Sequence, residues 1–301
     1  MCLTIAYNAL LYEAAFIQEL LRQYQLLLEQ IIDRPHENIL HYSLLTDEAR
    51  KILPDPAQPL LKQWKQSIPD IITEQALNRP EATAVVDGQT QWSYADIEAV
   101  SNRIANYLVG VGLQERDVVA VFAAREASLV ASILGILKAG AAFMILDPSY
   151  PYGRLHKKLT ISQPKAFLHL PGAGALPAEL EQFLSSKGLH YLSVPQTPTA
   201  LPEPLAQLPA THPAVALSPE HLAYVAFTSG STGEPKGILG THLPLAHFFP
   251  WHIQKFGLQP SDNFSMLSGL SHDPILRDMF TPLCLGATLF VPPQSSLYDS
   301  E

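Results

Sequence analysis

The chain has 301 residues, of which 47% are hydrophobic and 16% charged, which is enough apolar material for one large globular domain or two. With 19 basic and 28 acidic residues its formal net charge is −9, which argues against nucleic acid or an anionic membrane as its main partner. Cys2 and Cys284 are too few for a disulfide framework, so the composition favours a reducing, cytoplasmic location.

The first predicted element is an amphipathic helix from Glu13 to Asp33. Its apolar residues recur at helical spacing, with polar residues between them: Ile17, Leu20, Leu21, Tyr24, Leu28 and Ile31. We expect this apolar face to be poorly covered by the rest of the chain.

A proline-rich stretch separates this helix from the rest of the chain. It contains Pro54, Pro56 and Pro59, and prolines at such density mark a linker. The sequence therefore predicts a helical segment over residues 1–52, a linker over residues 53–65 and a larger domain over residues 66–301.

The larger domain begins with the pattern of an α/β fold. Ser93 and Asp96 are spaced as in a capping box and start a helix that continues to Gly110. Residues 118–122 are typical of a buried strand, and a helix through Lys138 and a strand over residues 142–146 follow. This βαβ unit predicts the fold class, which is α/β with layered, parallel-rich sheets and flanking helices.

The apolar run over residues 128–146 is also long enough to be considered as a membrane span. Lys138 and Gly140 divide it, however, and a buried helix that ends at Gly140, followed by a strand, accounts for the same residues. We therefore expect no membrane partner.

Prolines crowd residues 171–219, so this region is predicted to be mostly irregular surface chain with short elements, such as one over residues 189–194. Further strands are predicted over residues 264–267 and 288–291. A helix is predicted between them, from about Pro274 to Leu285.

Residues 228–237, TSGSTGEPKG, follow a predicted buried strand over residues 224–227 and have the chemistry of a phosphate-binding loop. Glycines let the backbone approach an anion closely, the hydroxyls add donors, and the lysine adds a mobile cation. The spacing differs from that of the Walker loop, so a P-loop NTPase is rejected. The predicted polyphosphate ligands are Thr228, Ser229, Gly230, Ser231, Thr232, Gly233, Lys236 and Gly237. The alternative is a flexible Gly/Ser linker.

This decapeptide resembles the signature loop of the adenylate-forming superfamily, which includes acyl-CoA synthetases, luciferases and the adenylation domains of nonribosomal peptide synthetases. Residues 137–155, LKAGAAFMILDPSYPYGRL, and residues 92–97, WSYADI, are similar to two upstream core motifs of those adenylation domains. The resemblance implies the large N-terminal subdomain of that fold. It also implies an amino-acid-activating reaction in which ATP and an amino acid give an aminoacyl adenylate and pyrophosphate, with Mg²⁺ beside the phosphates and Lys236 as a catalytic residue.

The N-terminal segment YNALLYEAAFIQELLRQYQLLLEQIIDRPHENILHYSLLTDEAR resembles the C-terminal tail of a condensation domain, the module that precedes adenylation domains in peptide synthetases. The catalytic histidine pair of a condensation domain is absent from this chain. The resemblance therefore implies a non-catalytic remnant over residues 1–52, and a simple N-terminal helical extension is the alternative.

His272 and Asp273 stand where peptide-synthetase adenylation domains have a Phe-Asp-x-Ser motif, whose Asp pairs with the α-ammonium of the substrate. The resemblance assigns Asp273 to substrate binding, and an ordinary helix N-cap is the alternative. His272 replaces the aromatic residue, and we predict a catalytic role for it as a gate or polar contact. The alternative for His272 is a core histidine.

Arg277 follows Asp273 by four residues and is predicted either to bind a second substrate carboxylate or to pair with Asp273. The stretch HDPILRDMFTPLCLGA resembles α-aminoadipate reductase adenylation domains, so a dicarboxylic amino acid is a conceivable substrate. We expect no metal site at His242, His247 and His252, because a five-residue spacing does not align them on one helix face.

The resemblance also implies functional parts that do not occur among the 301 residues, namely later core motifs, a C-terminal subdomain with its lysine, and a phosphopantetheine carrier on a separate domain. We therefore expect an incomplete active site and an open sheet edge. The expected partners are an amino acid, a condensation domain, the C-terminal subdomain and a carrier protein. The alternative function is a non-catalytic remnant that binds nucleotide or a synthetase partner.

Overall fold

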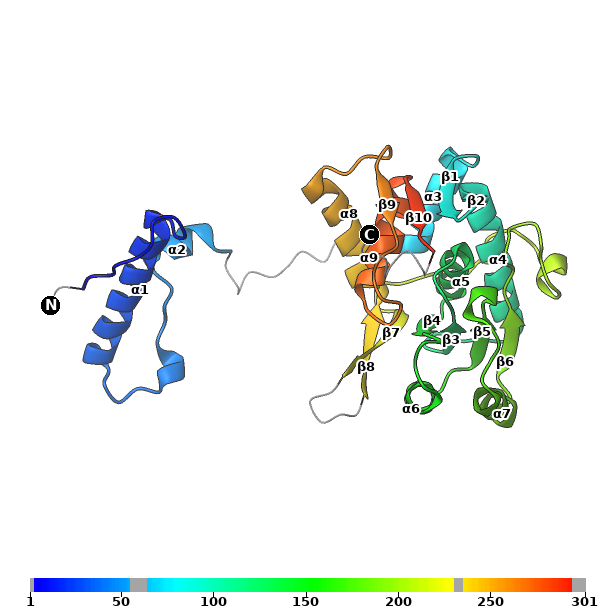
Figure 1. The fold of residues 1–301 in the computed structure, drawn as a ribbon, viewed down its shortest axis with the longest axis horizontal. Helices are drawn as coiled ribbons and strands as arrows, with labels where there is room; N and C mark the ends of the chain where they lie inside the picture. Colours follow the sequence, from blue (N-terminus) through cyan, green and yellow to red (C-terminus); the bar gives the residue numbers. More distant parts are fainter. Residues whose placement is uncertain (1–2, 55–63, 230–234, 294–301) are drawn as a thin grey trace. The chain divides into compact units, whose positions relative to one another are not determined.

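The computed structural model describes residues 3–54, 64–229 and 235–293. The chain forms two units, residues 1–62 and residues 63–301, and each is described by itself. Figure 1 shows the elements of both. Pro56 and Pro59, on which the linker prediction depends, lie outside the described residues, so the predicted domain limits stay a prediction.

The first unit contains the helix α1 (Ala14–Asp33), a 3₁₀ turn (Ile39–His41) and the short helix α2 (Asp47–Ile52). The chain returns along α1 because the Gln30 amide donates to the carbonyl oxygen of Ser43 at 2.7 Å. The Thr46 hydroxyl donates to Glu19 at 2.6 Å and also caps α2. The amphipathic helix is thus confirmed within one residue of the predicted start.

The apolar face of α1 is poorly covered, as predicted. Only Ile17 among the residues of α1 is buried, whereas the side chains of Leu20 and Tyr24 are 44% and 47% exposed. Within this unit there is not enough packed chain to cover the helix, because α2 has six residues.

The second unit contains two sheets. The larger has the strand order β6-β5-β3-β4-β7-β8 and the smaller has the order β2-β1-β10-β9. The strands of the larger sheet are β3 (Val118–Phe122), β4 (Ala142–Leu146), β5 (Ala166–His169), β6 (His190–Ser193), β7 (Leu222–Ser229) and β8 (Pro235–Thr241). Those of the smaller sheet are β1 (Thr83–Asp87), β2 (Thr90–Ser93), β9 (Asn263–Ser265) and β10 (Thr288–Val291). Only the β1–β2 and β7–β8 pairs among these neighbours are antiparallel, so the parallel-rich α/β prediction is confirmed.

Helices and sheets alternate in layers (Figure 1). The helices of this unit are α3 (Ile68–Asn78), α4 (Tyr94–Gly110), α5 (Ala127–Lys138), α6 (Tyr152–Ser162), α7 (Ala178–Lys187), α8 (His242–Phe256) and α9 (Pro274–Leu285). One core joins α4 and α5 to the face of β3 that carries Val119 and Val121. A second core joins α6 and α7 to the opposite face, which carries Val118, Ala120 and Phe122. The period-2 alternation of a strand thus supplies both cores.

The βαβ prediction is confirmed in detail. α4 begins with the predicted capping box, in which Ser93 and Asp96 exchange hydrogen bonds with each other's backbone N–H. β3 and β4 have the predicted bounds and pair in parallel. Gly140 adopts a φ of 76° two residues after the end of α5, a conformation that favours glycine and ends the helix there.

Two sequence-based predictions need correction. Residues 171–219 are mostly irregular with short elements, as predicted, but one of these elements is the helix α7, which was not expected and which buries Leu180 and Leu184 against α6 and the sheet. The first strand after the phosphate loop was expected over residues 264–267, but β9 spans Asn263–Ser265. For α7, the packing of Leu180 and Leu184 outweighs the proline signals around the helix.

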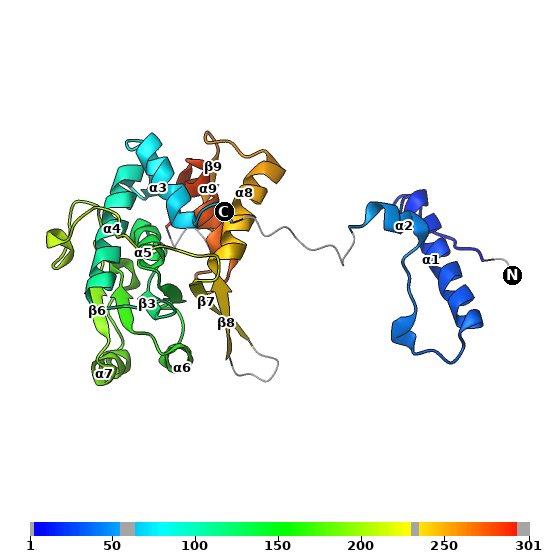
Figure 2. The ribbon, with the colours of Figure 1, turned by 180° about the vertical axis from the view of Figure 1, so that it is seen from behind.

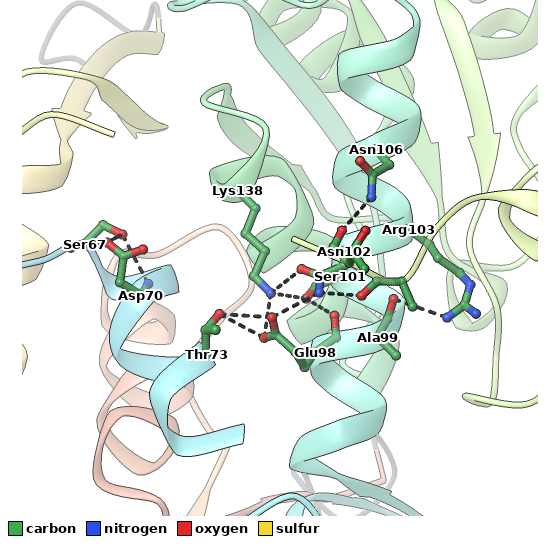
Figure 3. Close-up of polar contacts among 12 residues, drawn as sticks. Ser67, Asp70, Thr73, Glu98, Ala99, Ser101, Asn102, Arg103, Asn106 and Lys138 are labelled. Atoms are coloured by element: carbon green, nitrogen blue, oxygen red, sulfur yellow. Dashed lines mark hydrogen bonds and ion pairs between the residues drawn. The ribbon is translucent and has the colours of Figure 1, made fainter. Parts of the chain in front are cut away.

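A buried polar cluster holds three helices together (Figure 3). The Lys138 ammonium is fully buried and donates to Glu98 Oε2 at 2.7 Å, Ser101 Oγ at 2.9 Å and Asn102 Oδ1 at 2.8 Å. The hydroxyl of Thr73, on α3, also donates to Glu98. All three ammonium donors are used, so this lysine of the upstream motif joins α5 to α4 and, through Glu98, to α3.

No helix in the described ranges is long and apolar enough to cross a membrane.

Candidate functional site

The predicted phosphate loop lies within a β-hairpin at the edge of the larger sheet. β7 and β8 are antiparallel, and their register places Thr228 opposite Lys236 and Phe227 opposite Gly237. In both views, β8 lies at the end of the sheet away from α7 (Figures 1 and 2). The sequence indicated a loop over the whole decapeptide, whereas its flanks continue the strands. Gly230, Ser231, Thr232 and Gly233 lie outside the described residues.

The side chains of Thr228 and Lys236 are exposed, and they come from facing strand positions. A hydroxyl and an ammonium at such positions can both donate to one anion. Pro235 is tolerated here because β8 is an edge strand and Pro235 is its first residue. The hairpin therefore presents donors at the entrance to the loop.

The middle of the hairpin is shaped by Gly240. A Cβ atom at this position would lie 2.2 Å from the ring of Tyr224, so only glycine allows the ring to lie against β8. Burial raises the pKa of Tyr224, and the carboxylate of Asp273 raises it further. Tyr224 thus lies within electrostatic range of Asp273.

The loop between β9 and α9 carries the second predicted motif, and two buried or half-buried side chains hold it. Asp278 accepts hydrogen bonds from the backbone N–H groups of Leu267 at 3.1 Å and Ser268 at 2.8 Å. The Arg125 guanidinium donates to the Ser268 carbonyl oxygen at 3.1 and 2.8 Å. Neither residue was predicted from the sequence to position the site.

Asp273 precedes α9 and is exposed. Its backbone φ and ψ are −58° and −29°, which are helical values, and its side chain makes no capping hydrogen bond among the described residues. The alternative of an ordinary helix N-cap is therefore wrong, since a capping residue has extended dihedral angles. A carboxylate in this state is available to a ligand.

His272 is also exposed, so the alternative of a core histidine is wrong. A Cβ atom on Gly269 would lie 2.5 Å from His272 Nδ1, so the imidazole ring lies close against the backbone of its own loop. One cavity is lined by His272 and Asp273 on one side and by Tyr224 and Phe227 of β7 on the other. The strand that leads into the phosphate motif and the His272–Asp273 motif thus meet at one cavity, although they are far apart in the sequence.

Arg277 is half exposed, and its guanidinium lies 3.1 Å from the carboxylate of Asp278. The predicted alternative of an ion pair with Asp273 is wrong in the described structure, because the adjacent carboxylate takes the arginine. Arg277 is not among the residues that line the cavity of Asp273. Its assignment to a second substrate carboxylate stays a prediction.

Lys158 is a site residue that the sequence did not indicate. It lies on α6, is 3% exposed, and lines the cavity that His272 and Asp273 also line. Its signal in the sequence is weak, namely its position four residues after Arg154 in a helix without acidic residues. The tertiary fold brings it to the hairpin, because α6 packs against β8.

The three spaced histidines do not form a metal site. His242 and His252 lie on α8, where burial lowers the pKa of both, to about 4 for His242. His252 Nδ1 lies 3.2 Å from the hydroxyl of Thr281. In the described parts of the chain, no group of three or more His, Cys, Asp or Glu side chains is placed to hold a metal ion.

Comparisons with known proteins concern the family and the fold. The family model described as AMP-binding enzyme matches residues 72–301. The chain is 36% identical over 321 residues to the L-2-aminoadipate reductase large subunit of Candida glabrata, with 98% of this chain and 23% of the relative covered. It is 32% identical to CymA of Salinispora arenicola, a probable non-canonical nonribosomal peptide synthetase, with 99% of this chain and 4% of the relative covered.

A solved structure has the same fold. The crystal structure of the nonribosomal peptide synthetase FmoA3 (S1046A) matches with a TM-score of 0.73 at 24% sequence identity, covering 94% of this chain and 29% of that chain. The chain thus spans about a quarter of the length of the reductase and less than a third of this synthetase.

Proposed function

This chain belongs to the family of AMP-binding enzymes, and from that premise we propose that it is part of an amino-acid-activating adenylation domain. The reaction proposed joins the carboxylate of an amino acid to AMP, with ATP as the donor and pyrophosphate as the second product. The observation that carries the proposal is the shared cavity of Phe227, His272 and Asp273, which puts the strand leading into the phosphate loop beside a carboxylate that has no ion-pair partner among the described residues.

The cavity and the neighbouring hairpin have separate roles. Asp273 is exposed and makes no capping bond, so it can accept hydrogen bonds from a substrate ammonium. Thr228 and Lys236 face each other on the hairpin and can donate to phosphate oxygens. His272 lines the cavity beside Asp273, and we propose that it contacts the reacting carboxylate.

The described residues fit a polyphosphate, because exposed hydroxyl and ammonium groups stand at facing positions of one hairpin. ATP would supply the adenylyl group and a pyrophosphate leaving group. We propose that Mg²⁺ enters with ATP and is held mainly by its phosphates, since the described carboxylates and histidines do not gather into a metal site.

We propose an amino acid as the substrate, because the carboxylate of Asp273 can pair with a substrate ammonium. A dicarboxylic amino acid is the class to test first. The aminoadipate reductase of Candida glabrata is 36% identical to this chain, and aminoadipate, which its name contains, is a dicarboxylic amino acid. Arg277 is the proposed ligand of the second carboxylate, and it would have to exchange its ion pair with Asp278 for one with the substrate.

We also propose that residues 1–52 are a remnant of a condensation domain joined by a linker to the adenylation domain, with a C-terminal subdomain, a carrier protein and a condensation domain as partners. The support is that the match to CymA covers 99% of this chain, so the first unit has a counterpart in that relative. A cytoplasmic location fits the two cysteines, of which Cys284 is a buried free thiol and Cys2 lies outside the described residues.

Amino-acid-dependent exchange of radiolabelled pyrophosphate into ATP tests the function. The chain is assayed alone and with a supplied C-terminal half, against aminoadipate, other amino acids and carboxylic acids without an amine. We expect exchange only with the supplied half and only with amino acids, because the C-terminal lysine stabilises the developing charge. Exchange by the 301 residues alone would contradict the expectation that their active site is incomplete. Nucleotide binding without exchange, both by the chain alone and with the supplied half, would favour a non-catalytic remnant.

A further inference from the structure

Helix α6 carries two cations that have no acidic partner among the described residues. Arg154 and Lys158 lie four residues apart and are therefore neighbours on one helix face, where like charges repel. The sequence of the helix, YGRLHKKLTIS, contains no Asp or Glu. Neither side chain forms an ion pair with a described residue.

Lys158 is the more unusual of the two because it is buried. Its ammonium is 3.3 Å from the hydroxyl of Ser271 and lies over the rings of Tyr150 and Phe227, 5.1 and 5.6 Å from their centroids. Burial lowers the pKa of Lys158 to about 8, the charge of Arg154 lowers it further, and Asp147 opposes the shift. A buried ammonium without a carboxylate partner costs free energy, and an anion that binds there would offset this cost.

Lys158 also lines two cavities at once. One is the cavity of Phe227, His272 and Asp273. The other is lined by Lys158 with Arg154 from α6 and with Thr228 and Pro235 from the hairpin. Thr228 lies on β7 and Pro235 on β8, and both belong to the predicted phosphate-binding decapeptide, so the helix places its cations beside the described parts of that segment.

We propose that α6 is a second polyphosphate-binding element, in which Lys158 and Arg154 bind the terminal phosphates of the nucleotide together with Thr228. An ammonium offers three donors, and a guanidinium binds phosphate oxygens in pairs. The hydrogen bond to Ser271 and the rings of Tyr150 and Phe227 hold the Lys158 ammonium in place. It lies beside the cavity that Arg154, Thr228 and Pro235 also line. The inference rests on the proposed function for the identity of the nucleotide, but pyrophosphate alone tests it.

The test measures the binding of pyrophosphate, ATP and AMP to the full chain by titration calorimetry. Lys158→Met keeps the length of the side chain and removes the charge, whereas Lys158→Arg keeps the charge. The control is Lys187→Met, because Lys187 also lies over a phenylalanine ring, 5.8 Å from the centroid of Phe183, but at the end of α7 and away from the hairpin. Thermal unfolding of each variant reports whether the fold is intact.

We expect Lys158→Met to weaken pyrophosphate and ATP binding by about tenfold or more, which corresponds to about 1.4 kcal/mol, and to change AMP binding by less than about twofold. Lys158→Arg should restore most of the loss, and Lys187→Met should bind like the unchanged protein. An intact Lys158→Met variant with unchanged pyrophosphate affinity would overturn the inference, as would an unchanged chain that does not bind pyrophosphate. A Lys158→Met variant that loses AMP affinity as strongly as pyrophosphate affinity would also overturn it.

The inference and the proposed function fail in different ways. Pyrophosphate binding that depends on Lys158, without amino-acid-dependent exchange in the completed protein, would support the inference and contradict the function. Exchange in the completed protein with unchanged pyrophosphate affinity in Lys158→Met would do the opposite.

Discussion

The carboxylate of Asp278 accepts a hydrogen bond of 2.8 Å from the backbone N–H of Ser268, ten residues earlier in the chain. The helix that begins after Asp273 therefore also fixes the loop that leads to it, so the position of His272 and Asp273 depends on a carboxylate one helical turn away. This carboxylate is buried, and its other oxygen pairs with Arg277.

Asp278→Asn is expected to loosen this loop, because the neutral amide accepts more weakly from two backbone N–H groups than a carboxylate does. Loss of the charge-assisted bonds should lower the free energy of unfolding by about 1 to 3 kcal/mol. Hydrogen exchange by mass spectrometry should show reduced protection at the amides of Leu267 and Ser268. Arg277→Ala is the control, because a half-exposed ion pair contributes about 0 to 1 kcal/mol, and equal effects of the two variants would contradict the prediction.

Lys236→Ala is expected to abolish most nucleotide binding, since it removes the cation opposite Thr228 on the phosphate hairpin. We expect ATP affinity to fall by about tenfold or more, on the scale of one charge-assisted bond. Titration of the chain with ATP measures the change. Lys255→Ala, at the exposed end of α8, is the matched control. Unchanged ATP affinity in Lys236→Ala would count against the assignment of the loop.

The Lys138 cluster predicts a large coupling between α4 and α5. Glu98→Gln should destabilise the second unit by about 3 to 5 kcal/mol, because it leaves the buried ammonium without a charged partner. Adding Lys138→Met should recover part of this loss, so the double variant should be more stable than the sum of the single changes implies. Urea unfolding of the four proteins measures the coupling. Additive effects would show that the two charges act independently.

Two buried groups predict opposite effects of pH on stability. Burial raises the pKa of Glu126 from 4.5 to about 7, so folding takes up a proton and this group contributes less stability as pH rises from 4.5 to 7. Burial lowers the pKa of His242 from 6.5 to about 4, so its contribution is complete above pH 6.5 and is lost as pH falls toward 4. Between pH 4.5 and 6.5 the two contributions oppose each other.

Single variants separate the two contributions. Relative to the unchanged protein, Glu126→Gln should gain stability with rising pH, by about 1.4 kcal/mol per pH unit between pH 4.5 and 6.5. His242→Asn should lose stability with rising pH at a similar rate. Unfolding free energies at several pH values measure both slopes. Variant curves that run parallel to that of the unchanged protein would show that neither group titrates as expected.

Local patterns were sufficient for the elements that contain their own signals. The capping box at Ser93 and the bounds of β3, β4, α9 and β10 followed from spacing, and the structure has them as predicted. α7 was missed because prolines dominate its surroundings. α8 was not predicted either, because it contains Pro250 and its apolar residues surround much of the helix.

The residues of the candidate site also fall into two groups, those that the sequence identified and those that it did not. The loop motif, Asp273 and His272 were identified in the sequence, because each belongs to a short pattern of residues that are adjacent along the chain. Lys158, Tyr224 and Arg125 were not identified, because they reach the site only through the packing of α6 on β8, the contact of Tyr224 with Gly240, and a hydrogen bond across two loops.

By itself, therefore, the sequence determined the class of fold, and it predicted which residues bind phosphate and the substrate amine, since hydrophobic period and contiguous motifs are local properties. Tertiary structure decided that Thr228 faces Lys236, that Arg277 pairs with Asp278, and that a buried lysine without an acidic partner in the described structure lies between the hairpin and Asp273. The physical reason is that strand register, ion-pair choice and burial depend on which distant elements pack together, and no local pattern specifies that packing.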